Sequence, residues 1–188
     1  MKTDIETEEV IEPMAIRVAL HPFLAGLNRT QLALLSDCAV AACFKNGETI
    51  LRQGELADRF YLIETGKVVL ESETDYGLPV PIETIGAGQL LGWSWMFPPY
   101  VWHFTARAIA PTKAIFFYGT LLRQYCERDH SLGYELLKRM SAVMVNRLQT
   151  AREKMAGKEF EPPVLDLHDP PFQKPRTTRS KVVPAIAR

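Results

Sequence analysis

The stretch GETILRQGELADRFYLIETGKVVL, residues 47–70, carries the clearest structural pattern in this chain of 188 residues. Short runs of β-branched and aromatic residues are separated by Gly47, Gly54 and Gly66. Short strands separated by glycine turns are typical of antiparallel sheets that close or roll up. Within the stretch, ETGK at 64–67 predicts a tight hairpin with Gly66 in a left-handed conformation.

The same pattern continues as far as Tyr118. Seven of the eleven glycines lie between residues 47 and 92. The predicted strands are ETIL at 48–51, RFYLIE at 59–64, KVVLES at 67–72, PVPIETI at 79–85, ARAIA at 106–110 and KAIFFY at 113–118. The sequence therefore predicts a mainly β fold with flanking helices, in which residues 21–130 form an antiparallel, jelly-roll-like β-roll.

The segments on either side of these strands have a different texture. HPFLAGLNRTQLALLSDCAVAACF, residues 21–44, predicts a helical lead-in to the roll with Asn28 as an N-cap. Residues 1–20 are expected to be an N-terminal extension. Residues 158–188 contain six prolines, which leave no window long enough for a DNA-recognition helix. We therefore expect a disordered tail there and no direct sequence-specific binding to DNA.

A long helix is predicted over residues 131–157, after a short helix at 120–128 and with Asp129 or Ser131 as its cap. Apolar and small residues recur on it in steps of 4, 3, 4, 3 and 4: Leu137, Ser141, Met144, Leu148, Ala151 and Met155. A second stripe that can face the roll consists of Leu136, Met140 and Val143. Two apolar faces favour a homodimer formed through the first stripe, and the alternative is one broad core face.

Composition narrows the class of protein. Lys plus Arg and Asp plus Glu both number 22, so no net field attracts nucleic acid or membrane. No apolar run is long enough to span a bilayer, and the acidic N-terminus lacks the features of a signal peptide. The odd number of cysteines, three, argues against a disulfide framework and favours a reducing cytoplasm. We expect no metal site, because Cys126 and His130 supply at most half of one.

A helical lead-in, a β-roll punctuated by glycines, a short helix and a long helix together resemble the cyclic nucleotide-binding domain. More specifically, the chain resembles the effector domains of catabolite-activator and FNR-type (Crp/Fnr) regulators. The resemblance is carried by residues 47–70 and by IGAGQLLGW at 85–93, and it extends from His21 to Gly157. It implies that the loop after the second glycine of G-x-x-x-G holds a cyclic phosphate on backbone N–H groups.

The same resemblance places a Glu directly after that glycine, for the ribose, and an Arg followed by Ser or Thr, for the phosphate. Here Gly92 keeps the glycine, Trp93 stands where the Glu would be, and Trp102-His103 stands near the Arg-Ser pair. Arg107 lies too far along the chain to replace the arginine. Because two charge-assisted bonds are worth on the order of 100-fold or more in affinity, we expect no cyclic AMP binding of the usual kind.

Aromatic residues gather in this loop. Six of the eighteen in the chain lie between positions 93 and 104. The candidate ligand pocket consists of Gly92, Trp93, Ser94, Trp95, Trp102, His103 and Phe104, with His103 as its polar contact. Three interpretations stay open: a pocket for a cyclic nucleotide or another small planar ligand, aromatic side chains that fill the old pocket, and a docking patch for a partner protein.

No nucleophile in the sequence is paired with a base, and GAGQLLG at 86–92 lacks the spacing of a dinucleotide fingerprint. We therefore expect no enzyme, no catalytic residues and no cofactor beyond such a ligand. The sequence predicts a stand-alone regulatory or sensor module. The alternatives are a ligand-free scaffold that uses the aromatic loop or the proline-rich tail, and a transcription regulator that acts through a partner.

Overall fold

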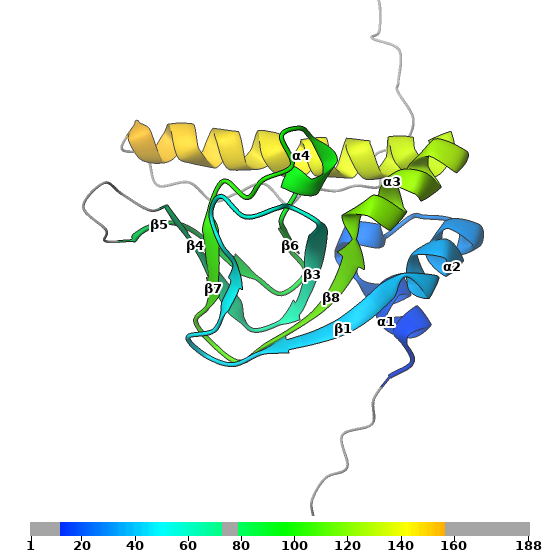
Figure 1. Ribbon diagram of the computed structural model, residues 1–188, viewed down its shortest axis with the longest axis horizontal. Helices are drawn as coiled ribbons and strands as arrows, with labels where there is room; N and C mark the ends of the chain where they lie inside the picture. The colour runs from blue at the N-terminus through cyan, green and yellow to red at the C-terminus, as the bar shows by residue number, and fades with distance from the viewer. Residues whose placement is uncertain (1–11, 73–78, 157–188) are drawn as a thin grey trace, which may run out of the picture.

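The computed structural model describes residues 12–72 and 79–156. Its strands are β1 (Ala39–Phe44), β2 (Thr49–Leu51), β3 (Arg59–Thr65), β4 (Lys67–Ser72), β5 (Val80–Gly86), β6 (Leu90–Leu91), β7 (Thr105–Ala108) and β8 (Thr112–Tyr118). Two antiparallel four-stranded sheets result, in the orders β1-β8-β3-β6 and β2-β7-β4-β5. They roll up against one another (Figure 1), which confirms the mainly β fold and the β-roll predicted from the sequence.

Helices flank the roll at both ends of the described chain. They are α1 (Met14–Leu20), α2 (Arg29–Asp37), α3 (Gly119–Arg128) and α4 (His130–Met155), with the short 3-10 turns η1 (Pro22–Leu24) and η2 (Ser94–Met96). None of these helices has the length and apolar character needed to cross a bilayer. The proline-rich tail expected at 158–188 lies outside the described residues, as do residues 1–11 of the expected N-terminal extension.

The turn at 64–67 is a corner between the two sheets and not the hairpin predicted from the sequence. Strand β3 pairs with β6 and β8, whereas β4 pairs with β5 and β7. Gly66 does take the predicted left-handed conformation, with φ of 94°. Alternation of apolar residues shows that two strands meet at a glycine turn, but it does not show whether they pair with each other.

The helical lead-in predicted as far as Phe44 is wrong at its C-terminal end. Helix α2 begins after Asn28, whose Oδ1 accepts a hydrogen bond from the Gln31 N–H at 2.9 Å, as the predicted N-cap requires. The helix ends at Asp37, and Ala39–Phe44 forms β1, which pairs with β8 along its length. A short apolar run such as AVAACF fits a helix or a strand equally well, and here the neighbouring strand decides.

Helix α1 lies within the segment expected to be an N-terminal extension and packs onto the domain. Val18 is buried in the apolar cluster between the helices and the first sheet, called here the helix-side core or helix-side cluster. The Arg17 guanidinium donates two hydrogen bonds to the Glu64 carboxylate on β3. The described part of the extension, residues 12–20, is therefore held by both apolar and ionic contacts with the roll.

Strand β3, in the first sheet, is buried on both of its faces. Successive residues of a strand point to opposite sides, so Phe60 and Leu62 join an apolar cluster beneath the helices, whereas Tyr61 and Ile63 join a second cluster inside the roll. This double burial explains why the sequence of β3 reads as an almost continuous apolar run and not as a strict alternation.

Helix α4 runs along the roll (Figure 1) and begins at the predicted cap. Asp129 Oδ1 accepts hydrogen bonds from the N–H groups of Ser131 at 3.0 Å and Leu132 at 3.1 Å. The inner stripe is confirmed, because Leu136 and Met140 are fully buried and Val143 packs against the helix-side cluster.

His21 ties the start of the domain to the first sheet. It is buried; its Nδ1 accepts a hydrogen bond from the Phe23 N–H, and its Nε2 lies 3.2 Å from the carbonyl oxygen of Ile63. Burial lowers the pKa of His21 below its ordinary value of 6.5. The imidazole is therefore neutral in the folded protein, with Nε2–H as the donor to Ile63.

This arrangement predicts a loss of stability in mild acid. Below pH 6.5 the unfolded chain protonates His21 while the folded chain resists protonation, so the free energy of unfolding should fall by up to about 1.4 kcal/mol per pH unit. Urea unfolding of wild type and His21→Gln at about pH 7.5 and about pH 5.5 measures this. The wild type should lose more stability than the variant, and equal losses would show that another group titrates.

Candidate functional site

The loop between β6 and β7 encloses a small cavity of about 20 Å³. Six of the seven residues proposed from the sequence line it: Gly92, Trp93, Ser94, Trp102, His103 and Phe104. The remaining lining residues are Leu51, Leu70, Leu91 and Arg147. A space of this size holds about one water molecule, whereas sites for small-molecule ligands measure about 300–1,000 Å³.

The indole of Trp102 fills the interior of the roll. Its side chain is buried, with 5% of the residue exposed, and it belongs to the inner apolar cluster together with Leu51, Leu70 and Leu91. Its backbone is paired on both sides: the Trp102 N–H donates to the carbonyl of Glu55, and the Gly54 N–H donates to the carbonyl of Trp102, both at 2.9 Å. The indole is thus held from a fixed backbone.

Gly92 makes room for this indole. Its φ is 84°, and a Cβ atom added there would lie 2.9 Å from Cζ3 and 3.0 Å from Cη2 of Trp102. Any side chain at position 92 would therefore press on the indole as well as strain the backbone. In the resemblance this glycine serves a phosphate, whereas here the structure places an aromatic ring against it.

Trp95 is not in the pocket, contrary to the prediction from the sequence. Turn η2 carries it away from the cavity into the helix-side core, where it is fully buried. Its indole stacks on Phe60 with ring centroids 5.5 Å apart and an interplanar angle of 16°. A 3-10 turn points neighbouring side chains in different directions, so Trp93 lines the cavity and Trp95 does not, although Trp93 also packs against the helix-side cluster.

The mouth of the cavity is aromatic. Trp93 is half-buried, and its ring lies 6.2 Å from that of the exposed His103 and 6.5 Å from that of Phe97. No acidic side chain lines the cavity within the described residues. Trp93 therefore stands where a ribose-binding carboxylate was expected, and an indole N–H cannot accept a hydrogen bond from a hydroxyl.

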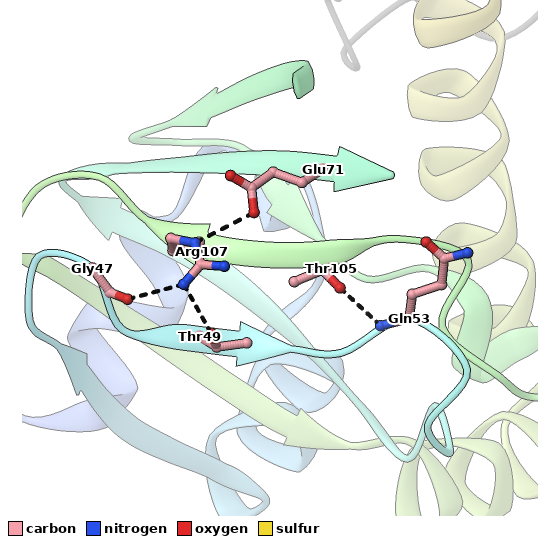
Figure 2. A network of polar contacts seen from close by, with 6 residues as sticks. All are labelled: Gly47, Thr49, Gln53, Glu71, Thr105 and Arg107. Atoms are coloured by element: carbon pink, nitrogen blue, oxygen red, sulfur yellow. Dashed lines mark hydrogen bonds and ion pairs between the residues drawn. The ribbon is translucent and has the colours of Figure 1, made fainter. Parts of the chain in front are cut away.

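Arg107 faces away from the cavity, in agreement with its exclusion above. Its neighbours Ala106 and Ala108 point into the roll, so Arg107 projects from the outer face of β7. Figure 2 shows its guanidinium between β4 and β2, where Nε lies 3.3 Å from the Glu71 carboxylate and Nη1 lies 3.4 Å from Thr49 Oγ1. This arginine holds three strands of the second sheet together.

Arg147 of α4 is the one arginine that lines the cavity within the described ranges, and the sequence analysis missed it. Its Nη2 donates to the carbonyl of Leu90 at 2.7 Å, and its Nε lies 3.3 Å from the Glu83 carboxylate. Burial lowers the pKa of Arg147, and the Glu83 charge opposes that shift. Arg147 thus connects the long helix to β5 and β6 beside the loop.

A second arginine fixes the loop to α3. Arg123 Nη1 donates to the carbonyl of Trp95, and the guanidinium carbon lies 4.8 Å from the centroid of the Tyr100 ring. A cation over an aromatic face is attracted by about 0.5–2 kcal/mol. The loop is therefore attached to α3 by Arg123, and Arg147 attaches α4 to β6, the strand from which the loop starts.

The cysteines of the described residues are not activated thiols. The three cysteines, Cys38, Cys43 and Cys126, are free. Burial raises the pKa of Cys38 to about 11 and also raises that of Cys126, which keeps both as weakly nucleophilic thiols. Within residues 12–72 and 79–156, no three His, Cys, Asp or Glu side chains lie together as a metal site would need.

Comparison with known proteins finds a family model that matches the central part of this chain. Residues 42–129 match the model of the family described as the cyclic nucleotide-binding domain. The chain is 37% identical over 71 residues to the cAMP-dependent protein kinase type II regulatory subunit of Drosophila melanogaster, a match that covers 38% of this chain and 19% of the relative. The chain thus spans about a fifth of that relative's length.

Solved structures share the fold over about three quarters of the chain. A putative cyclic nucleotide-binding protein from Geobacter metallireducens is 28% identical, with a TM-score of 0.63, and the match covers 73% of this chain and 98% of the other. The catabolite activator protein of Thermus thermophilus is 21% identical, with a TM-score of 0.59, over 72% of this chain and 62% of the other. The second likeness, at its lower identity, concerns the fold.

Proposed function

Because this chain contains a cyclic nucleotide-binding domain, like the effector domains of Crp/Fnr regulators in structure, we propose that it is a regulatory module that does not bind cyclic AMP in the usual way. Domains of this kind are typically regulatory and not enzymatic. We propose that the module acts through its conformation and its contacts with partners. It would do so in the cytoplasm, where its three free thiols stay reduced.

The observation that carries the proposal is the state of the ligand site. A cavity of about 20 Å³ remains where a nucleotide would have to fit, and Trp102 occupies the surrounding space. The groups expected to hold the ribose and the phosphate are replaced by Trp93 and by Trp102-His103. Space and chemistry both disfavour a charged, hydrated ligand, since Arg147, the one arginine that lines the cavity within the described residues, is already bonded to Leu90 and Glu83 and a buried phosphate without a partner is expensive.

A titration tests this proposal. Cyclic AMP and cyclic GMP added to the purified chain should produce no saturable change in tryptophan fluorescence or in heat up to about 1 mM. Tryptophan fluorescence is a suitable readout because Trp93 and Trp102 line the site, so a ligand that entered it would change their emission. Non-cyclic 5′-AMP serves as the control for nonspecific effects. Micromolar association with cyclic AMP, absent with 5′-AMP, would overturn the proposal.

Assembly as a homodimer through α4 is part of the proposal. The outer stripe of the helix exposes large apolar side chains, with exposed fractions of 44% at Leu137, 61% at Leu148 and 80% at Met155. These residues repeat at heptad spacing on a helix whose other apolar stripe is already buried. A second copy of the chain would cover the exposed stripe. The two α4 helices would then pair, with one β6–β7 loop contributed by each copy.

Charge placed on this stripe should separate the two copies. Met144→Glu combined with Leu148→Glu should convert a dimer into a monomer on size-exclusion chromatography with light scattering, because buried carboxylates would face one another. Gln149→Glu is the matched control, since residue 149 is exposed and lies away from the stripe. A double variant that stays dimeric, or a wild type that is monomeric at high concentration, would remove dimerisation from the proposal.

The filled cavity favours a second candidate function, that of a ligand-free interaction module. In this case the loop, with exposed Phe97 and His103, or the tail at 158–188, would bind a partner protein, including a transcription factor. A panel of small planar metabolites separates the two candidates. A change in emission or melting temperature with one of them supports a sensor, whereas no response to any of them supports the interaction module.

A further inference from the structure

We propose that the Trp102 indole is a built-in occupant of the roll that keeps α4 in its observed position, and that the space it fills is a site for a flat, apolar aromatic molecule of indole size. The inference rests on the proposed function, because it assumes that the roll has no nucleotide to hold. It goes further by naming what holds the roll and its helix in place instead.

The surroundings of the indole have the chemistry of a ligand site for an aromatic ring. The inner cluster around it is apolar, including Leu51, Leu70 and Leu91, and Gly92 presents a surface without a side chain to the ring edge. The occupant fits with little space to spare, since about 20 Å³ remains. Removal of the indole would leave a flat, mostly dry cavity, and such cavities bind apolar aromatic molecules.

The occupant is fixed to the roll and does not swing in and out of it. The backbone of residues 100–102 pairs with residues 54–57: Ala57 N–H donates to Tyr100 O at 2.7 Å, Leu56 and Val101 form an isolated β-bridge, and both peptide groups of Trp102 are bonded. Because this backbone is fixed and the ring packs closely against Gly92 and the inner cluster, the indole keeps the site filled. The module is therefore held permanently in an occupied state.

Occupancy reaches α4 through Arg147. This residue lines the same cavity as the indole and donates a hydrogen bond to Leu90, two residues before the glycine that contacts the indole. Loss of the indole would leave Leu91 and Gly92, which directly follow Leu90 in the chain, without support on that side. The hydrogen bond from Arg147 would then weaken, and α4 would be less firmly held against the roll.

Removal and replacement of the ring tests the inference. Trp102→Ala should melt below wild type, and indole at about 100 times its Kd should raise its melting temperature by roughly 5–10 °C. Indole should also restore slow hydrogen exchange in the middle of α4, which Trp102→Ala should lose. Indole should change neither the melting temperature nor the hydrogen exchange of the wild type. Trp93→Ala is the matched control, because it removes an indole from the mouth and leaves the interior filled.

Three results would overturn the inference: no response of a folded Trp102→Ala to indole, an equal response of Trp93→Ala, or a rise in melting temperature without any change in exchange of α4. Should Trp102→Ala fail to fold, Trp102→Leu with benzene decides between the same outcomes, since leucine keeps part of the packing. Binding of cyclic AMP by wild type would contradict the proposed function. The indole experiment is a separate test, so its outcome would still decide on the role of Trp102.

Discussion

Gly66→Ala is expected to lower the free energy of unfolding by about 4 kcal/mol, a large part of the roughly 5–15 kcal/mol that stabilises a domain. The added Cβ would lie 2.5 Å from the carbonyl oxygen of Pro111 and 2.6 Å from Cα of Thr112, and would also crowd the Thr112 hydroxyl. These are mostly backbone atoms, so rotation of a side chain cannot relieve the clash. The φ of 94° adds backbone strain.

Gly54→Ala separates these two causes. Gly54 has a similar φ of 83°, but a Cβ there would meet nothing within 4 Å. This variant should lose only about 1–2 kcal/mol, the cost of the left-handed backbone. Urea unfolding of both variants gives the difference. Equal losses would show that the corner between β3 and β4 has room to move. The close approach of this corner to the β7–β8 turn would then not be the reason why residue 66 has to be glycine.

The strands could be read from the sequence more readily than their pairing. Each run of β-type residues from ETIL to KAIFFY became a strand, because alternation with glycine turns is a local signal. The corner at Gly66 and the strand AVAACF could not be predicted in this way. Both depend on which neighbour is available: β8 offers an edge to β1, and β4 joins the opposite sheet.

The candidate site was predicted in part for the same reason. The loop residues that line the cavity are close in sequence, and the resemblance pointed to them, whereas Arg147 comes from a helix more than forty residues later. A signal for it did exist. Arg147 continues the inner stripe of Leu136, Met140 and Val143 at helical spacing, so a charge was directed toward the roll. A charged residue on a buried stripe indicates a polar partner beneath it.

The three tryptophans of the loop contribute differently to the free energy of unfolding. Trp95→Ala should show the contribution of the helix-side core. Trp95 is fully buried and stacks on Phe60, which itself stacks on Phe117 with ring centroids 4.9 Å apart. Truncation of such a residue leaves a cavity that the packed rings cannot close. The loss in the free energy of unfolding should be about 3–5 kcal/mol.

Trp93→Ala removes the same side chain from the half-buried mouth of the cavity and should lose no more than about 1–2 kcal/mol. Thermal and urea unfolding of the two variants under the same conditions make the comparison. The cavity and the core share this short loop because η2 turns Trp95 fully into the core toward Phe60, whereas the half-buried Trp93 lies beside His103 and only its inner side packs against the helix-side cluster. If Trp93→Ala were as destabilising as Trp95→Ala, this division of the loop between core and mouth would be wrong.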